Sequence, residues 1–114
     1  MYKRITVLAI LGIALLCTGS AAAQQVTSCT DIAAPGEYSL TNDLTDRPEQ
    51  SCIDITSSNV ILNGQGHVVD GVNGAGTVGI NVTNPSQTLT NVTVKNITAQ
   101  KWETNVEYRN TNNG

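Results

Sequence analysis

Carboxylates are the first candidates for chemistry in this sequence, and Asp54 and Asp70 stand in its most structured stretch. A glycosidase needs a carboxylic acid and a second carboxylate at a defined separation, and a lyase needs a base and a cationic or metal-bound group. Asp54 is expected to point outward from a strand and Asp70 to lie at a turn. A matching segment carries Asn81 in place of Asp54, and Lys95 and Arg109 lie on other segments. We therefore expect solvated surface charges and assign no catalytic residue.

His67 is the only histidine of the chain, and it lies beside Val68 and Val69. A protein metal site needs three or four convergent ligands, and the sequence places no second histidine or free-cysteine cluster near this one. We expect a structural histidine at a corner or in a stack along neighbouring strands. We also expect no metal ion and no cofactor.

Glycines are concentrated between residues 61 and 80. Gly74, Gly76 and Gly79 spell G-x-G-x-x-G, which in a dinucleotide-binding fold precedes a helix. Here the motif precedes "INVTNP", a strand-like segment with a proline stop, so we expect a loop. Three further glycines are interpreted as tight corners that use a positive φ: Gly64, Gly66 and Gly71.

Three N-x-Thr sequons begin at Asn81, Asn91 and Asn96, none with proline in the middle. In an exported chain with a glycosylating host, each is a potential acceptor for an N-linked glycan. The alternative is that outward Asn and Thr side chains stack along the strands and hydrogen-bond to one another.

The amino-terminal segment has the layout of a secretory signal peptide. Lys3 and Arg4 precede a thirteen-residue apolar run over 5–17, and the small residues of 21–23 follow. A membrane-spanning helix needs roughly 20 apolar residues, so this run is too short to cross a bilayer. We expect residues 1–23 to be removed and residues 24–114 to be secreted or displayed at the cell surface, with no membrane span left.

Cys29 and Cys52 are the two cysteines of that mature chain. In an exported protein a cysteine pair indicates one disulfide, and two free thiols are the alternative. Without Lys3 and Arg4, four basic residues remain against nine acidic ones, a net charge of −5. This charge disfavours nucleic acids and anionic membrane surfaces as partners, since both require clustered Lys and Arg.

The mature chain shows alternating apolar residues rather than helical spacing. Ile53 and Ile55 flank Asp54, and similar alternation surrounds Asn81 and Thr93. Such β-branched alternation predicts short, half-buried strands separated by turns of Asn, Gly, Pro and Ser. The chain is therefore expected to be all-β.

The predicted strands recur with a long period. "CIDIT" at 52 is answered by "GINVT" at 79, and "NVILNG" at 59 by "NVTVKN" at 91. Aligning Ile53, Ile80 and Val106 gives spacings of 27 and 26 residues. A period of this size is typical of a solenoid, whose coils bury their apolar faces by stacking. An antiparallel sandwich is the alternative, but the sequence lacks convincing hairpins between complementary strands.

The runs "PGEYSLTNDL", "CIDITSSNVILNGQGHVVDG" and "LTNVTVKNIT" resemble the amino-terminal coils of right-handed parallel β-helix proteins of the pectin-lyase-like superfold, especially exported archaeal and bacterial surface proteins. The resemblance implies three short parallel sheets, an amino-terminal cap and about three to four coils. Members of the superfold usually have more coils. We therefore expect a truncated solenoid with an open carboxy-terminal edge that pairs with another chain.

The function expected from these observations is that of an exported, non-catalytic β-helix module with a structural, interaction or carbohydrate-contacting role. Its partners would be carbohydrate, another cell-surface protein, or a second copy bound through the open carboxy-terminal coil. One alternative is a fragment of a polysaccharide lyase or glycoside hydrolase of the same superfold. A second, also drawn from the resemblance, is a periplasmic accessory protein for copper-enzyme maturation.

Overall fold

The structure is a computed structural model that describes residues 22–112. Within that range the chain forms twelve short strands and no helix. In chain order the strands are β1 (Gln24–Val26), β2 (Thr30–Ile32), β3 (Gly36–Leu40), β4 (Ser51–Ile55), β5 (Val60–Asn63), β6 (Val68–Asp70), β7 (Val78–Val82), β8 (Leu89–Thr90), β9 (Val92–Lys95), β10 (Thr98–Gln100), β11 (Thr104–Tyr108) and β12 (Thr111–Asn112).

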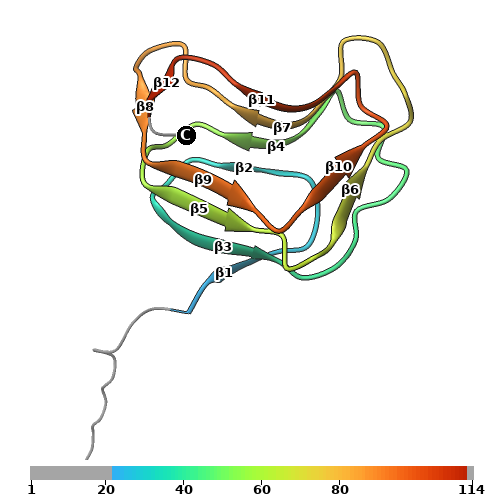
Figure 1. Cartoon of the computed structure of the whole chain (residues 1–114), viewed down its shortest axis with the longest axis horizontal. Helices are drawn as coiled ribbons and strands as arrows, with labels where there is room; N and C mark the ends of the chain where they lie inside the picture. Colours follow the sequence, from blue (N-terminus) through green and yellow to red (C-terminus); the bar gives the residue numbers. More distant parts are fainter. Residues whose placement is uncertain (1–21, 113–114) are drawn as a thin grey trace, which may run out of the picture.

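Every strand pair is parallel. Two four-stranded sheets form the main walls; sheet A has the order β1-β3-β5-β9, and sheet B has the order β2-β4-β7-β11. Sheet C pairs β6 with β10 and is extended by a bridge from Leu44 to Val69, while β8 and β12 form a fourth, two-stranded sheet. Figure 1 shows the chain winding around a common interior as a parallel β-solenoid of about three turns. This confirms the expected all-β solenoid and excludes the antiparallel sandwich.

The strand register confirms the repeat read from the sequence. Ile53 pairs with Ile80, and Ile80 pairs with Val106, so the spacings of 27 and 26 residues correspond to complete coils. In sheet A, Val60 pairs with Val92, as the match between "NVILNG" and "NVTVKN" requires. We name the three coils by their main strands: β3 and β4 in the first, β5 and β7 in the second, and β9 and β11 in the third. β1 and β2 form a partial layer ahead of them.

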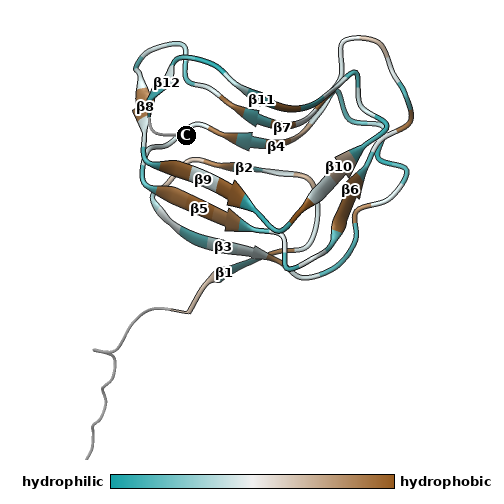
Figure 2. Ribbon diagram, in the orientation of Figure 1, coloured by the Kyte–Doolittle hydropathy of each residue, from teal (hydrophilic) through white to brown (hydrophobic). Residues whose placement is uncertain are grey.

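The core consists of apolar side chains stacked from coil to coil. Ile55 pairs with Val82, and both are fully buried. Leu62 of β5 faces them from sheet A and is also fully buried. Figure 2 shows brown, hydrophobic segments on β5, β6 and β9. The Val, Ile and Leu side chains thus supply the core without a single phenylalanine, because each coil contributes only a thin layer.

Asparagine, rather than glycine, occupies most of the left-handed corners. Gly66 has a φ of 82°, as expected for a corner glycine. Gly64 and Gly71 do not have positive φ; a Cβ at either would lie 2.5 Å from a backbone carbonyl oxygen of the next coil. The expectation for these two glycines was therefore wrong, because close stacking and not φ requires them. Asparagine tolerates the left-handed region better than other side chains, and five asparagines adopt it: Asn59, Asn73, Asn91, Asn96 and Asn110.

The only tryptophan fills the side of the solenoid next to sheet B. Trp102 is 6% exposed, and its Nε1 donates a hydrogen bond to the Val69 carbonyl oxygen at 3.1 Å. A Cβ on Gly71 or Gly79 would lie 2.8 Å from the indole. The last glycine of the G-x-G-x-x-G motif therefore accommodates an indole ring. It lies inside β7, and no helix follows it in the part of the chain that the structure describes.

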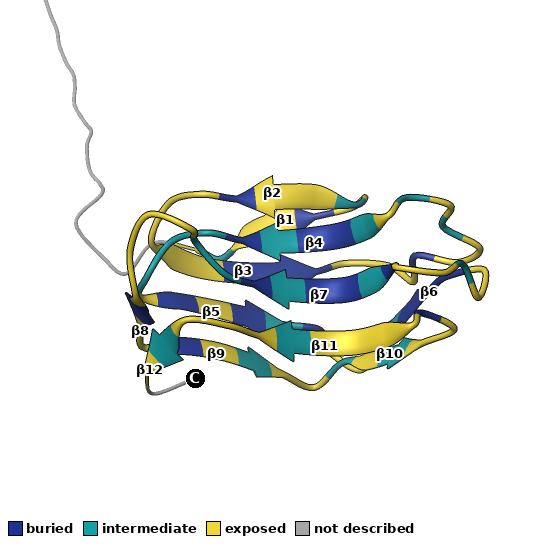
Figure 3. Ribbon diagram, turned by 90° about the horizontal axis from the view of Figure 1, so that it is seen from above, coloured by how far each residue is buried: buried dark blue, intermediate teal, exposed yellow. Residues whose placement is uncertain are grey.

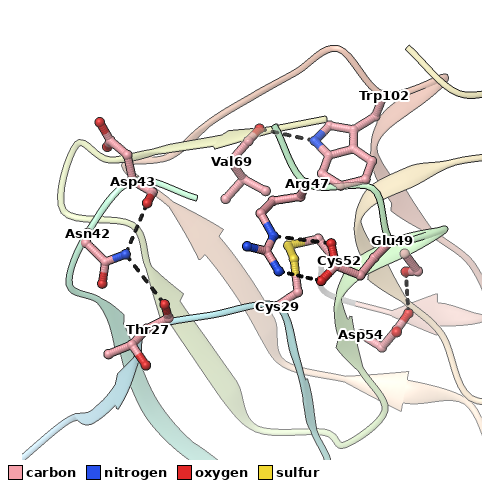
Figure 4. Close-up of a disulfide and its surroundings, with 11 residues drawn as sticks. Thr27, Cys29, Asn42, Asp43, Arg47, Glu49, Cys52, Asp54, Val69 and Trp102 are labelled. Atoms are coloured by element: carbon pink, nitrogen blue, oxygen red, sulfur yellow. Dashed lines mark hydrogen bonds and ion pairs between the residues drawn. A yellow bond between two sulfur atoms is a disulfide. The ribbon is translucent and has the colours of Figure 1, made fainter. Parts of the chain in front are cut away.

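Cys29 and Cys52 form the expected disulfide, with 4.5 Å between their Cα atoms. The bond joins the partial layer at β2 to β4 of the first coil. Figure 4 shows the disulfide in the same region as the Arg47–Glu49 ion pair and Trp102. The Arg47 guanidinium contacts both carboxylate oxygens of Glu49 and holds the pKa of that carboxyl below its ordinary value.

Most of the expected signal peptide, residues 1–23, lies outside the described residues, so its prediction stays untested. Over 22–112, no helix is long and apolar enough to cross a membrane.

Candidate functional site

A row of polar side chains crosses the outer face of sheet B. The strand register places Asp31 beside Asp54, Asp54 beside Asn81, and Asn81 beside Glu107. Each row member alternates with inward residues of its strand, so the row lies on the outside of the solenoid. Neighbouring strands are about 4.8 Å apart, which is close to the roughly 5–5.5 Å between the two carboxyl groups of retaining glycosidases. The pair Asp31 and Asp54 is therefore the nearest approach to a catalytic arrangement on this surface.

The row is partly engaged in contacts of its own. Ser51 Oγ donates a hydrogen bond to Asp54 Oδ1 at 2.6 Å, and Arg109 Nε lies 2.6 Å from Glu107 Oε2. The Oδ1 atom of Asn81 is buried without a hydrogen-bond partner. Asp31 is exposed, whereas Asp54 and Glu107 are half-buried. Asp31 is thus the member most open to solvent.

Asp31 did not emerge as a candidate in the sequence analysis, although a signal for it was present. "CTDI" at 29–32 matches "CIDI" at 52–55, and the register pairs Thr30, Asp31 and Ile32 with Ile53, Asp54 and Ile55. The match has a spacing of 23 residues, shorter than the 26 to 27 of the later coils. The shorter spacing concealed it.

The basic candidates lie apart from the two aspartates. Lys95 ends β9 in sheet A and pairs with Asn63 of β5. Arg109 follows β11 and is occupied by Glu107, two coils away from Asp54. No described cation is thus placed against the Asp31–Asp54 pair by an ion pair.

Asp70 is not the solvated turn residue that the sequence suggested. It ends β6 and is only 5% exposed, because the segment between β3 and β4 crosses over it. Its carboxylate accepts hydrogen bonds from the Asp46 N–H at 3.3 Å and from Gln100 Nε2 at 3.1 Å. Lys101 Nζ lies 3.9 Å from it. Asp70 is therefore a structural anchor between the first and third coils.

His67 lies one residue before β6 and contacts the coil that precedes it. Its Nδ1 is 3.1 Å from Asp43 Oδ1, which also accepts the Val68 N–H at 2.9 Å. The Val68 N–H, together with the His67 ring, holds the pKa of Asp43 below its ordinary value. Across residues 22–112, no group of three or more His, Cys, Asp or Glu side chains could hold a metal ion. His67 thus has a structural partner at a corner.

The three sequon asparagines have different surroundings. Asn91 and Asn96 are exposed at left-handed corners, and their Nδ2 atoms donate to the Oδ1 atoms of Asn59 and Asn63 at 3.0 and 3.2 Å. Asn81 is half-buried in β7. The stacking expected of outward asparagines is therefore present at two of the three sequons, and their glycosylation stays a prediction.

A shallow polar groove follows the corner between sheets A and C. It has a volume of about 640 Å³, and amide and hydroxyl side chains supply much of its lining. The residues that line it are Asn63, Gln65, Gly66, Asn96, Ile97 and Thr98. Groups of this kind exchange hydrogen bonds with hydroxyl-rich ligands.

The carboxy-terminal end of the solenoid exposes interior positions. Val106 is 40% and Tyr108 36% exposed, although their register partners Ile80 and Val82 are fully buried. Figure 3 shows this change as dark blue segments on β4 and β7 and a largely yellow β11. Tyr108 and Val94 line a hollow of about 410 Å³ at this end, and partial burial raises the pKa of the Tyr108 hydroxyl. β9 and β11 have no strand beyond them in the described chain, as expected for an open edge.

Comparison with known proteins matches this chain to no family model, no curated protein and no solved structure. The fold therefore stands on the strand register, which gives a parallel β-solenoid of about three turns.

Proposed function

We propose that the protein is an exported, non-catalytic β-helix module of the cell surface or the extracellular space that acts by contact. The observation that carries this proposal is the open end of the third coil. Val106 and Tyr108 are exposed at positions whose equivalents are buried in the preceding coils. An exposed apolar surface combined with unpaired strand edges is suited to binding another protein.

Export is supported by two observations. The first is the signal-peptide layout of residues 1–23. The second is the disulfide between Cys29 and Cys52, which is weakly consistent with an oxidising compartment. The pectin-lyase-like superfold is proposed on the same footing, from the match of "NVILNGQGHVVDG" to its pattern of strand, glycine turn and strand.

Contact with carbohydrate is part of the proposal. The polar groove of Asn63, Gln65, Asn96 and Thr98 offers donors and acceptors for sugar hydroxyls. The asparagine side chains there are held by a hydrogen bond between Asn96 Nδ2 and Asn63 Oδ1, so the groove is ordered before a ligand arrives.

A polysaccharide-cleaving enzyme is the second candidate, and the stacked pair Asp31 and Asp54 is the observation that favours it. The spacing of adjacent strands suits a retaining glycosidase. Against it, Ser51 already occupies one oxygen of Asp54, and the described cations pair elsewhere.

Turnover assays separate the two functions. The protein recovered from an exporting host is incubated with uronate-containing and neutral polysaccharides, and new reducing ends and unsaturated ends are measured. The contact module gives no turnover above that of the heat-denatured protein. Turnover that Asp31→Asn and Asp54→Asn both abolish, and that the exposed-surface control Glu37→Gln retains, would establish the enzyme instead.

A further inference from the structure

The two ends of the solenoid differ in the chemistry of their interior columns. In sheet B, Thr30, Ile53, Ile80 and Val106 form one inward column in register. Its first member is polar and its last is apolar. Both end residues are exposed, so the difference lies in the type of side chain and not in burial.

Sheet A repeats this arrangement. Gln24, Tyr38, Leu62 and Val94 form an inward column that begins with an exposed amide and ends with a half-buried valine. The amino-terminal end therefore has the polar outer layer of a capping repeat, which solenoids need for solubility. The carboxy-terminal end has the composition of an internal layer.

A second copy of this chain matches the apolar end only through its own apolar end. Head-to-tail stacking would set Val94 against Gln24 and Val106 against Thr30, so that apolar side chains meet polar ones. A contact between two carboxy-terminal coils, related by a two-fold axis, sets apolar side chains against apolar ones. Such a contact uses the same surface on both copies and closes after two subunits.

The charge distribution favours the same contact. Residues 24–91 carry seven acidic side chains and one basic one, whereas 92–112 carry three basic and two acidic. Two acidic chains therefore repel each other least when they meet at their third coils. Glu107 and Arg109 flank Tyr108 on β11, so a two-fold axis near Tyr108 brings Glu107 of each copy to Arg109 of the other. The Arg109 side chain is 66% exposed and free to exchange its partner.

We propose that two copies of the chain bind each other through their third coils about a two-fold axis, and that Val106 and Tyr108 form the centre of the contact. This inference rests on the proposed contact function and names its partner as a second copy. The dimer buries the hollow between Val94 and Tyr108 and covers the open edges of β9 and β11.

The molar mass of the oxidised, exported protein, measured by light scattering over a range of concentrations, tests the proposal. We expect a dimer that does not grow further. Val106→Lys is expected to raise the dissociation constant at least about tenfold, since a central apolar contact is replaced by a charge. The matched control is Ile61→Lys, because Ile61 is 38% exposed on sheet A of the second coil, away from the open end. It should leave the dimer intact.

The folded state of both variants is checked by circular dichroism, and both should remain folded because the two side chains are already exposed. A monomer at every concentration would overturn the dimer, as would masses that rise beyond two subunits, which head-to-tail stacking produces. A dimer that Val106→Lys leaves unchanged would overturn the location of the contact. None of these results affects the turnover assay, so the dimer and the contact function fail separately.

Discussion

Trp102 lies across Gly79 of the preceding coil. A Cβ at Gly79 would lie 2.8 Å from the indole Cδ1 and 2.7 Å from the Asn105 carbonyl oxygen. The buried indole is held by its hydrogen bond to Val69. A glycine that resembles part of a phosphate-binding motif is thus explained by the packing of one aromatic side chain.

Replacing Gly79 with alanine should therefore destabilise the fold. The added methyl group meets backbone and a fixed indole, and overpacking of this kind costs about 1–3 kcal/mol. The midpoint of urea unfolding measures the loss. Gly74→Ala, in the same motif, is the control, because its Cβ would meet only a Thr77 methyl group, at 3.0 Å. Equal losses in the two variants would contradict the packing role of Gly79.

The disulfide should contribute strongly to a domain this small. Cys29 and Cys52 close a loop with a sequence separation of 23, which the chain-entropy model values at about 3 kcal/mol. Replacing both cysteines with alanine should lower the free energy of unfolding by about that amount. Chemical denaturation with and without a reductant measures it. The reductant should destabilise the native protein and leave the double variant unchanged; an equal effect on both would contradict the prediction.

The sequence predicted the inward positions well and the connections poorly. The spacing between Ile53, Ile80 and Val106 revealed complete coils, because stacking constrains the side chains that share a column. Asp70 was misplaced because its burial depends on a segment more than twenty residues earlier that folds back over it. The pairing of Asp31 with Asp54 was missed because the amino-terminal layer is shorter than a full repeat.

The left-handed corner at Asn91 predicts a difference between two substitutions. Asn91 has a φ of 59°, and its side chain donates to Asn59. Asn91→Gly and Asn91→Ala both remove that hydrogen bond and the sequon. Only alanine must also adopt the left-handed region, which costs about 1–2 kcal/mol. Thermal or urea unfolding should therefore find the alanine variant less stable than the glycine variant, and equal stabilities would contradict the corner geometry.

The contact between Asp43 and the next coil predicts a dependence on acid. The pKa of Asp43 is lowered by the Val68 N–H and by His67. A carboxyl whose pKa is lower in the folded state stabilises the fold above its unfolded pKa, and this contribution is lost as pH falls through the folded value. Below about pH 4, native stability should thus fall more steeply than that of Asp43→Asn. Urea titrations at several pH values measure the slopes. Glu37→Gln controls for the loss of one surface charge, and identical slopes for the native protein and Asp43→Asn would refute the role of Asp43.

The three sequons should not be used equally in a glycosylating host. Asn91 and Asn96 are exposed at corners, whereas Asn81 is half-buried between Asp54 and Glu107 with its Oδ1 atom shielded from solvent. Since an attached glycan is bulky and needs an exposed acceptor, we expect glycans on the first two residues and none on the third. The intact mass of the secreted protein should fall by one glycan in Asn91→Gln and in Asn96→Gln, and should show no such loss in Asn81→Gln. A glycan on Asn81 would show that the outer face of sheet B is more open than the row of stacked side chains indicates.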